Sequence, residues 1–289
     1  MTTLIAQITD MHIRPAGKKA YGVVDTEAML RAAVRTIAAQ PRQPDMVIAT
    51  GDLTDCGLPE EYELLQDCLK PLGMPVYLIP GNHDRRETMR QVFGGDGYLP
   101  SSGEYLHYTI EEHPVRVIAL DTVVPGKGYG EMDAARLAWL NERLDEQPDR
   151  PTAIFMHHPP FPTGLGHMDS INCRNAPALA DILRHRPNIE RVACGHHHRS
   201  IQIRWAGTIG SVSPSVAHQV VLDLLPHDDA TFALEPPGYH LHLWQPGAGL
   251  ITHTAFVGQF SGPHPFLLDP DYPAYSDKES APATHAKKA

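Results

Sequence analysis

Residues 45–55 read DMVIATGDLTD, and this stretch decides the fold class. The mostly apolar run from Asp45 to Ala49 is typical of a buried β-strand. A glycine and two aspartates follow, and a glycine such as Gly51 permits a sharp turn and close approach of the backbone to an ion. The segment therefore predicts a buried strand that ends in candidate metal ligands, with Asp52 first among them.

The sequence on both sides of this segment alternates short apolar runs with helical patterns. A helix capped by Asp25 or Thr26 is predicted because apolar residues recur at helical spacing from Leu30 to Ile37. Proline is tolerated in the first turn of a helix, so Pro59 opens another. The predicted strands are residues 4–9, 45–49, 76–79, 116–120, 153–156 and 191–194, and the later helices are 59–69, 132–144 and 176–184. This alternation predicts an α/β domain whose sheet is covered by helices.

The pattern changes after about residue 198. Residues 201–225 and 239–257 have the character of strands, the latter pair joined by a turn at 245–249, and they predict a β-rich edge, lid or dimer region. From Asp269 onward, Pro, Ser, Ala and charged residues dominate, which predicts a disordered tail. The expected division is therefore a core at 1–198, a lid or dimerisation region with returning strands at 199–262, and a C-terminal strap and tail at 263–289.

Composition excludes several classes of protein. The chain has 289 residues and a net charge of -10, which repels polyanions, so a nucleic-acid polymer is not an expected partner. An anionic substrate then needs a local positive site, and a pair of divalent cations would supply one. The 4 cysteines lie far apart without a C-x-x-C pair, which excludes a zinc ribbon or a dense disulfide framework.

No basic leader precedes the first apolar run, and no stretch of about 18 consecutive apolar residues occurs. We therefore expect no signal peptide, no membrane partner and a cytoplasmic location.

Five clusters of polar residues lie at or just past the ends of predicted strands, where open α/β sheets bind ligands. They are Asp10-Met11-His12, Gly51 to Asp55, Gly81 to Asp84, His157 to Pro160 and Gly195 to His198. Most of their side chains are of types that bind metal ions. In extended chain, residues i and i+2 point to the same side, so Asp10 should converge with His12, and His196 with His198. Met11 and His197 should then face elsewhere.

These clusters resemble the calcineurin-like metallophosphoesterases, whose pattern is D-x-H, G-D-x-x-D, G-N-H-D, H and G-H-x-H. All five blocks are present in order. Segments 10–15, 57–62, 77–84 and 153–160 further resemble the bacterial glycerophosphodiesterases of the class III cyclic-nucleotide phosphodiesterase branch, and the similarity runs to roughly Gly262. The resemblance implies a four-layer α/β/β/α sandwich with a β-rich lid and dimerisation region, and a homo-oligomer, a dimer or higher.

The resemblance also implies a ligand set for two metal ions, divalent or of mixed valence, which could be Fe, Zn, Mn or Co. One ion would take Asp10, His12 and His198, the other Asn82, His157 and His196, and Asp52 would bridge them. Asp52, Asn82 and His83 are the implied catalytic residues, and Asn82, His83 and His218 would bind substrate.

The implied activity is hydrolysis of small phosphodiesters, such as glycerophosphodiesters, by a metal-activated hydroxide. Two divalent ions, two aspartates and a hydroxide leave one positive charge, which a singly charged diester neutralises and a doubly charged monoester would exceed. An alternative is a 3',5'-cyclic nucleotide phosphodiesterase. A non-catalytic scaffold is disfavoured because no ligand position is lost, and a nuclease is opposed by the acidic balance.

Several neighbouring residues allow two interpretations. His158 should hydrogen-bond beside the site instead of binding metal, and Asp55 is interpreted as a turn-forming aspartate. Asp84 is interpreted as a possible helix N-cap. Arg14 and Arg199 either contact phosphate or lie in solvent.

Overall fold

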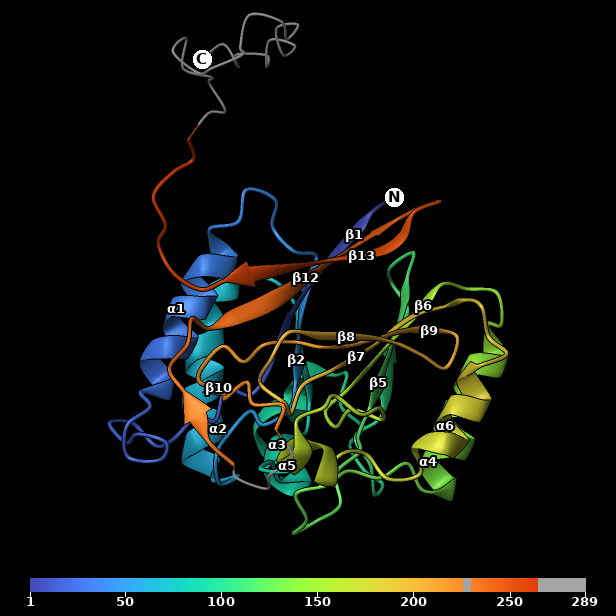
Figure 1. Ribbon diagram of the computed structural model, residues 1–289, viewed down its shortest axis with the longest axis horizontal. Coiled ribbons are helices and arrows are strands. Elements are labelled where there is room, and N and C mark those ends of the chain that lie inside the picture. Colours follow the sequence, from blue (N-terminus) through green and yellow to red (C-terminus); the bar gives the residue numbers. More distant parts are fainter. Residues whose placement is uncertain (226–229, 265–289) are drawn as a thin grey trace, which may run out of the picture. The chain divides into compact units, whose positions relative to one another are not determined.

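Two β-sheets form the centre of the protein (Figure 1). The computed structural model describes residues 1–225 and 230–264, and residues 1–258 form one unit. In the first sheet β1, β2 and β3 are parallel and β12 runs antiparallel to β1. Its strands, in spatial order, are β13 (Gly249–Phe256), β12 (Gly238–Gln245), β1 (Thr3–Ile8), β2 (Met46–Thr50) and β3 (Val76–Ile79).

The second sheet has six strands, of which β5, β6, β7 and β9 run parallel. Its strands, in spatial order, are β4 (Tyr108–Ile110), β5 (Arg116–Leu120), β6 (Thr152–Met156), β7 (Ile189–Cys194), β9 (Thr208–Val212) and β8 (Ile201–Trp205). The predicted strands of residues 1–198 are all present, with ends shifted by one or two residues.

Helices cover the outer faces of both sheets, with α1 and α2 on one side and α4 and α6 on the other (Figure 1). Asp25 caps the first helix by accepting from Ala28 N at 3.0 Å, and Glu61 accepts from Leu58 N at 3.1 Å at the start of the second. The α-helices are α1 (Thr26–Ala38), α2 (Pro59–Leu69), α3 (Arg86–Phe93), α4 (Ala134–Glu146), α5 (Gly166–Ser170) and α6 (Ala176–Leu183). Short 3-10 turns occupy Lys70–Leu72 and Gly94–Asp96.

The layering follows from the alternation of side chains along the strands. In β6, Ala153 and Phe155 belong to the core cluster shared with the first sheet. Ile154 and Met156 point the other way and pack with α4 and α6. The order of layers is therefore helix, sheet, sheet, helix, and the predicted fold class is confirmed.

Polar contacts join the two sheets near the strand ends. The Gln7 amide nitrogen donates to Thr50 Oγ1 at 3.0 Å and, across the layer, to the carbonyl of Cys194 at 2.9 Å. The Gln7 amide oxygen lies 3.0 Å from His242 Nε2. Because these contacts are buried, they fix the relative position of β1, β2 and β7, whose ends carry the polar clusters.

Residues beyond 198 extend both sheets. The predicted pair of strands joined at 245–249 is confirmed as β12 and β13, and β8 with β9 extends the second sheet. A separate two-stranded sheet pairs β10 (Gln219–Val220) with β11 (Phe232–Ala233), so the strand predicted to continue to residue 225 ends earlier. The predicted tail from Asp269 lies outside the described residues, and the division at 198 and 262 stays a prediction.

In the described ranges, none of the helices combines the length and the apolar composition that crossing a membrane requires.

Candidate metal centre

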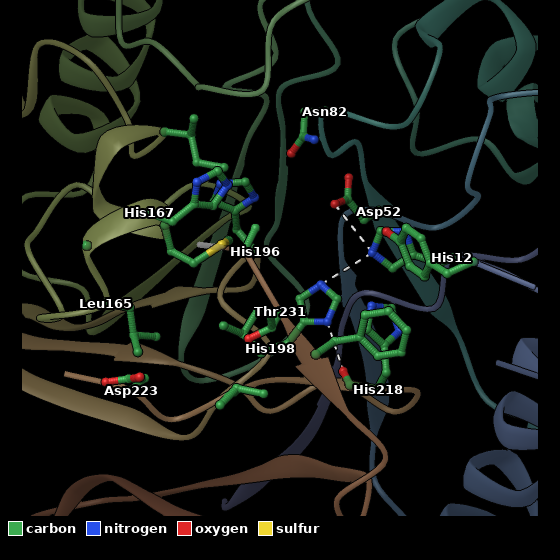
Figure 2. A pocket seen from close by; sticks show the side chains of 18 of the residues that line it. His12, Asp52, Asn82, Leu165, His167, His196, His198, His218, Asp223 and Thr231 are labelled. Carbon is green, nitrogen blue, oxygen red and sulfur yellow. Dashed lines mark hydrogen bonds and ion pairs between the residues drawn. The ribbon is translucent and has the colours of Figure 1, made fainter. Parts of the chain in front are cut away.

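All five polar clusters lie at the carboxyl ends of strands, at an edge where the two sheets meet. Figure 2 shows side chains from four of these clusters, namely His12, Asp52, Asn82, His196 and His198, facing one hollow. The residues that follow strands are Thr9 and Asp10 after β1, Gly51 and Asp52 after β2, Pro80, Gly81 and Asn82 after β3, His157 after β6, and Gly195 and His196 after β7. The sheet topology thus brings together residues far apart in the sequence, as in the contact of His196 N with Asp10 Oδ2 at 3.0 Å, which joins residues 186 positions apart.

The backbone at this edge is not extended. The φ angles of five candidate ligands are positive: Asp10 55°, His12 47°, Asp52 46°, His196 71° and His198 50°. Left-handed backbone at non-glycine residues is unfavourable by about 1–3 kcal/mol each and is typical of functional sites. The assumption of an extended chain is therefore wrong. Asp10 and His12 still converge in one donor cluster, as predicted, but His196 and His198 join different clusters because the chain turns at both.

Glycine at position 81 is needed for packing between the loops. A Cβ there would collide with the backbone nitrogen of Asp52 and with its carboxylate. The glycine therefore permits close approach of the loop that carries Asn82 to the loop that carries Asp52.

The first donor cluster is buried, and its ligating atoms lie within 4.8 Å of one another: Asp10, His12, Asp52 and His198. His12 Nδ1 lies 3.2 Å from the Asp55 carboxylate, and His198 Nδ1 lies 2.9 Å from the carbonyl of His218. Because both partners accept, each Nδ1 carries a proton, and the two Nε2 atoms face each other at 3.3 Å. His198 Nε2 is also 3.2 Å from Asp10 Oδ1. A cation, either a proton or a metal ion, is needed between these atoms.

The second cluster, formed by Asn82, His157 and His196, likewise turns acceptor atoms toward one another. His157 Nδ1 donates to the carbonyl of Thr50 at 2.7 Å, so its Nε2 faces Asn82 Oδ1 at 3.2 Å and Asp52 Oδ2 at 3.4 Å. Asp52 Oδ2 is also 3.7 Å from His12 Nε2, so this carboxylate lies between the two clusters. His196 Nε2 is buried and has no hydrogen-bond partner among the residues that the structure describes.

The charges of the site agree with this need for cations. Burial lowers the pKa of His157, but the negative charges of Asp52 and Asp10 outweigh burial and raise it to about 9. Burial and the neighbouring histidines hold the pKa of His196 well below its ordinary value, so this ring is neutral and can bind a metal. The mixed oxygen and nitrogen donors of the two clusters fit divalent transition metals.

His83 and His218 lie beside the clusters. The His83 backbone N–H donates to Asp52 Oδ1 at 3.0 Å, and its ring donates from Nδ1 to the Asp55 carbonyl at 2.8 Å. Burial lowers the pKa of His83, but the charges of Asp52, Asp55 and Asp84, with the hydrogen bond to the Asp55 carbonyl, together outweigh burial and raise it. The His218 ring is 4.6 Å from that of His198, and burial with its histidine neighbours lowers its pKa to about 2. Both rings line the hollow.

Asp84 is a functional residue that the sequence argument misread. Its carboxylate accepts from the backbone N–H of Leu53 at 3.0 Å and of Gly81 at 2.8 Å, and from the hydroxyl of Tyr62 at 2.9 Å. The N-cap interpretation is wrong, since Arg85 holds that position of α3. Asp84 instead ties the Asp52 loop to the Asn82 loop, and the G-N-H-D block itself was the available signal.

Asp55 also differs from its prediction. Its carboxylate accepts from His12 and lies 3.4 Å from Arg14 Nη1, so it orients a candidate ligand and is not simply a turn residue. Arg14 also contacts Glu61 at 3.2 Å, while Arg199 bonds Glu235 at 2.8 Å. Neither arginine lines the hollow.

His158 and His197 have different surroundings. His158 Nδ1 lies 2.7 Å from Thr122 Oγ1, which agrees with the predicted hydrogen-bonding role. Its Nε2 is buried, however, and has no hydrogen-bond partner within residues 1–225 and 230–264, and its ligating atom lies within 4.8 Å of those of His157 and His196. His197 is turned away and contacts Thr163, and Met11 is turned into the core, as predicted.

The outer wall of the hollow is formed mainly by residues of loops, of α5 and of the β10–β11 pair. Tyr21 and Phe232 are 54% and 36% exposed, and their ring centroids are 5.1 Å apart. Figure 2 shows Leu165 and Asp223 opposite His12 and Asp52 in this view. The remaining apolar wall residues are Met168, Ile171, Val220 and Val221. The hollow thus combines a polar floor with an apolar wall, as small-molecule sites commonly do.

Comparison with known proteins identifies close relatives. A probable glycerophosphodiester phosphodiesterase of Arcobacter nitrofigilis is 40% identical over 91% of this chain and 96% of its own length. The 3',5'-cyclic adenosine monophosphate phosphodiesterase of Escherichia coli is 28% identical over 74% of this chain and 76% of its own length. A dimetal phosphatase of Danio rerio has the same fold, with a TM-score of 0.60 at 16% identity, covering 89% of this chain and 99% of that chain.

Comparison of the sequence with protein families gives a further match. Residues 3–200 match the calcineurin-like phosphoesterases, which is the span that holds both sheets' parallel strands up to β7 and all five polar clusters. The resemblance inferred from the sequence is thereby confirmed: the chain belongs to the calcineurin-like phosphoesterase family.

Proposed function

We propose that this protein is a metal-dependent phosphoric diester hydrolase that acts on small diesters such as glycerophosphodiesters. The observation that carries the proposal is the pair of acceptor-rich clusters that share the carboxylate of Asp52. The 40% identical relative, itself a probable glycerophosphodiester phosphodiesterase, supports the substrate class.

One metal ion would be held by Asp10, His12 and His198, and the other by Asn82, His157 and His196. The Asp52 carboxylate would contact both ions. Bound there, two cations would lower the pKa of a water molecule and offset the charge of the attacked phosphate. We propose Fe, Zn, Mn or Co, in divalent or mixed-valence states, since each accepts this mixture of donors.

His83 and His218 would act on the substrate. His83 has a raised pKa and lines the hollow, which suits donation of a proton toward the leaving alcohol or a phosphate oxygen. His218 is held neutral by burial, which suits hydrogen bonding from the opposite side without adding charge. No lysine or arginine lines the hollow among the described residues, so recognition of phosphate would depend on the metal ions and these histidines.

Turnover of bis(p-nitrophenyl) phosphate tests the proposal. We expect metal-free protein to gain activity on addition of Mn, Co or Zn, and Asn82→Ala to lose most of it. Absence of turnover with every metal would contradict the proposal.

A 3',5'-cyclic nucleotide is the second candidate substrate. The aromatic side chains of Tyr21 and Phe232 at the rim of the hollow could stack on a base, and one relative is a cyclic adenosine monophosphate phosphodiesterase. The ratio of kcat/KM for cyclic AMP and glycerophosphoethanolamine separates the two, because the productive substrate should differ by orders of magnitude in transition-state binding.

We also propose that residues 199–262 serve as lid and dimerisation region in a cytoplasmic homo-oligomer. Two observations support this assignment. Val220 and Phe232 from β10 and β11 line the hollow. Exposed leucines lie on the same segment, namely Leu222, Leu224, Leu225 and Leu234. Light scattering of the purified protein measures the oligomeric state.

A further inference from the structure

A second hollow shares Asn82 and His83 with the first. Because these two residues line both, the candidate metal centre is bordered by two hollows. The other residues that line the second hollow are Asp55, Cys56, Asp84, Arg85, Arg86, Glu87, Val123, Pro125 and Gly126.

The two hollows differ in charge and polarity. The first has an apolar wall and contains several histidines, Asp52 and Asp223, but no lysine or arginine among the described residues. The second contains two arginines together with Asp55, Asp84 and Glu87. Arg86 is buried and pairs with Asp121, with two nitrogens on the two carboxylate oxygens. Arg85 is exposed and forms no ion pair with any residue in 1–225 or 230–264, so its guanidinium is available to a ligand.

The stem of Arg85 is held in place by its neighbours. A Cβ at position 57 would lie 2.5 Å from Arg85 Cγ and 3.0 Å from its Cδ, so glycine at this position lets the aliphatic stem lie against the backbone. The backbone N–H of Arg85 donates to the Tyr62 hydroxyl at 2.9 Å. The side chain therefore leaves the chain at a fixed point, two residues after His83.

We propose that the second hollow binds the hydroxyl-bearing ester arm of the diester, with Arg85 as its hydrogen-bond donor. A phosphodiester has two alcohol arms that diverge from phosphorus, and a centre bounded by two hollows can accept one arm in each. The polyol arm goes to the side of Arg85, because guanidinium groups donate well to hydroxyl and phosphate oxygens. The apolar or cationic arm goes to the aromatic and acidic first hollow. This inference rests on the proposed diesterase function.

Kinetics on two diesters test the proposal. Arg85→Gln should lower kcat/KM for glycerophosphoethanolamine about fivefold, mainly through KM, because an exposed hydrogen bond from a charged group is lost. The loss should be smaller for bis(p-nitrophenyl) phosphate, whose arms carry no hydroxyl group. Arg204→Gln is the matched control, since Arg204 is exposed and lines neither hollow. Arg85→Lys, which keeps the charge, should restore part of the loss.

Equilibrium binding provides a readout that does not depend on turnover. By calorimetry on the metal-loaded protein, Arg85→Gln should weaken glycerol 3-phosphate about fivefold and leave inorganic phosphate, which has no arm, within twofold of wild type. Equal effects on both ligands, or no effect on either, would overturn the proposal. If wild type hydrolyses neither diester, the proposed function fails and this inference with it. If wild type hydrolyses both and the ratio of kcat/KM for the two diesters is unchanged in Arg85→Gln, only this inference fails.

Discussion

The floor and the wall of the first hollow are built in opposite ways. The floor consists of buried side chains such as Asp52 and His196, held at the ends of parallel strands and tied to neighbouring loops. The wall consists of half-exposed side chains such as Tyr21 and Phe232, carried by loops and by the short β10–β11 pair. The difference indicates that the floor determines the chemistry and the wall the choice of substrate. Substitutions in the floor should therefore have large effects on metal binding and rate, and those in the wall small effects on affinity.

The largest effect is expected at Asp52, the carboxylate shared by the two clusters. Asp52→Asn keeps the shape but removes the charge that both cations need, so activity should fall on the order of a thousandfold. Metal content by elemental analysis should fall with it. Two bound ions and near wild-type turnover in this variant would contradict the assignment of Asp52.

A large loss of stability is expected at Asp84. Its carboxylate accepts from several donors at once, and asparagine would place an amide N–H against some of them. Asp84→Asn should lower the free energy of unfolding of the metal-free protein by about 2–3 kcal/mol, measured in urea. Asp149→Asn, at an exposed aspartate, is the control and should leave the midpoint unchanged.

Metal binding should depend on pH through His157, whose pKa in the metal-free protein is raised to about 9 by Asp52 and Asp10 against the effect of burial. A metal ion must displace this proton, so its affinity should fall about tenfold per pH unit below 9. Because the folded-state pKa is raised, this group stabilises the metal-free fold fully below its unfolded pKa of about 6.5. That contribution is lost as the pH rises through 9.

Calorimetry in two buffers of different protonation enthalpy measures the released proton. If the affinity for metal stays constant between pH 6 and pH 8 and no proton is released, metal binding does not displace the proton of His157, and this prediction is contradicted.

The smallest effect is expected in the wall. Phe232→Ala removes a half-exposed ring from the rim and should raise KM about threefold to tenfold while metal content and kcat stay near wild type. Phe256→Ala, on β13 and also exposed, is the control. A loss of bound metal in Phe232→Ala would break the division between floor and wall.

The same division decides how much the sequence could predict. Strands and their carboxyl ends follow from local apolar runs, so the positions of Asp52, Asn82 and His157 at one edge were predictable. The left-handed backbone at Asp10 and His198 was not, because local sequence favours an extended chain there and only the surrounding contacts impose the turn.

Contacts between distant segments were harder still. Asp84 could be read as a helix cap because its true partners, including Tyr62 and Leu53, lie 22 and 31 residues away. The wall joins Tyr21, Leu165 and Phe232, which no local pattern relates. Their meeting depends on how the loops pack on a finished core, and this information is not contained in any single segment.

The central claim is that two cations share the carboxylate of Asp52 at the edge where the sheets meet. Anomalous X-ray diffraction from crystals grown with excess manganese tests it most directly. We expect two peaks about 3.5–4 Å apart, one beside Asp10, His12 and His198, the other beside Asn82, His157 and His196, with Asp52 touching both. A single peak, or two peaks with Asp52 turned away from them, would contradict the account.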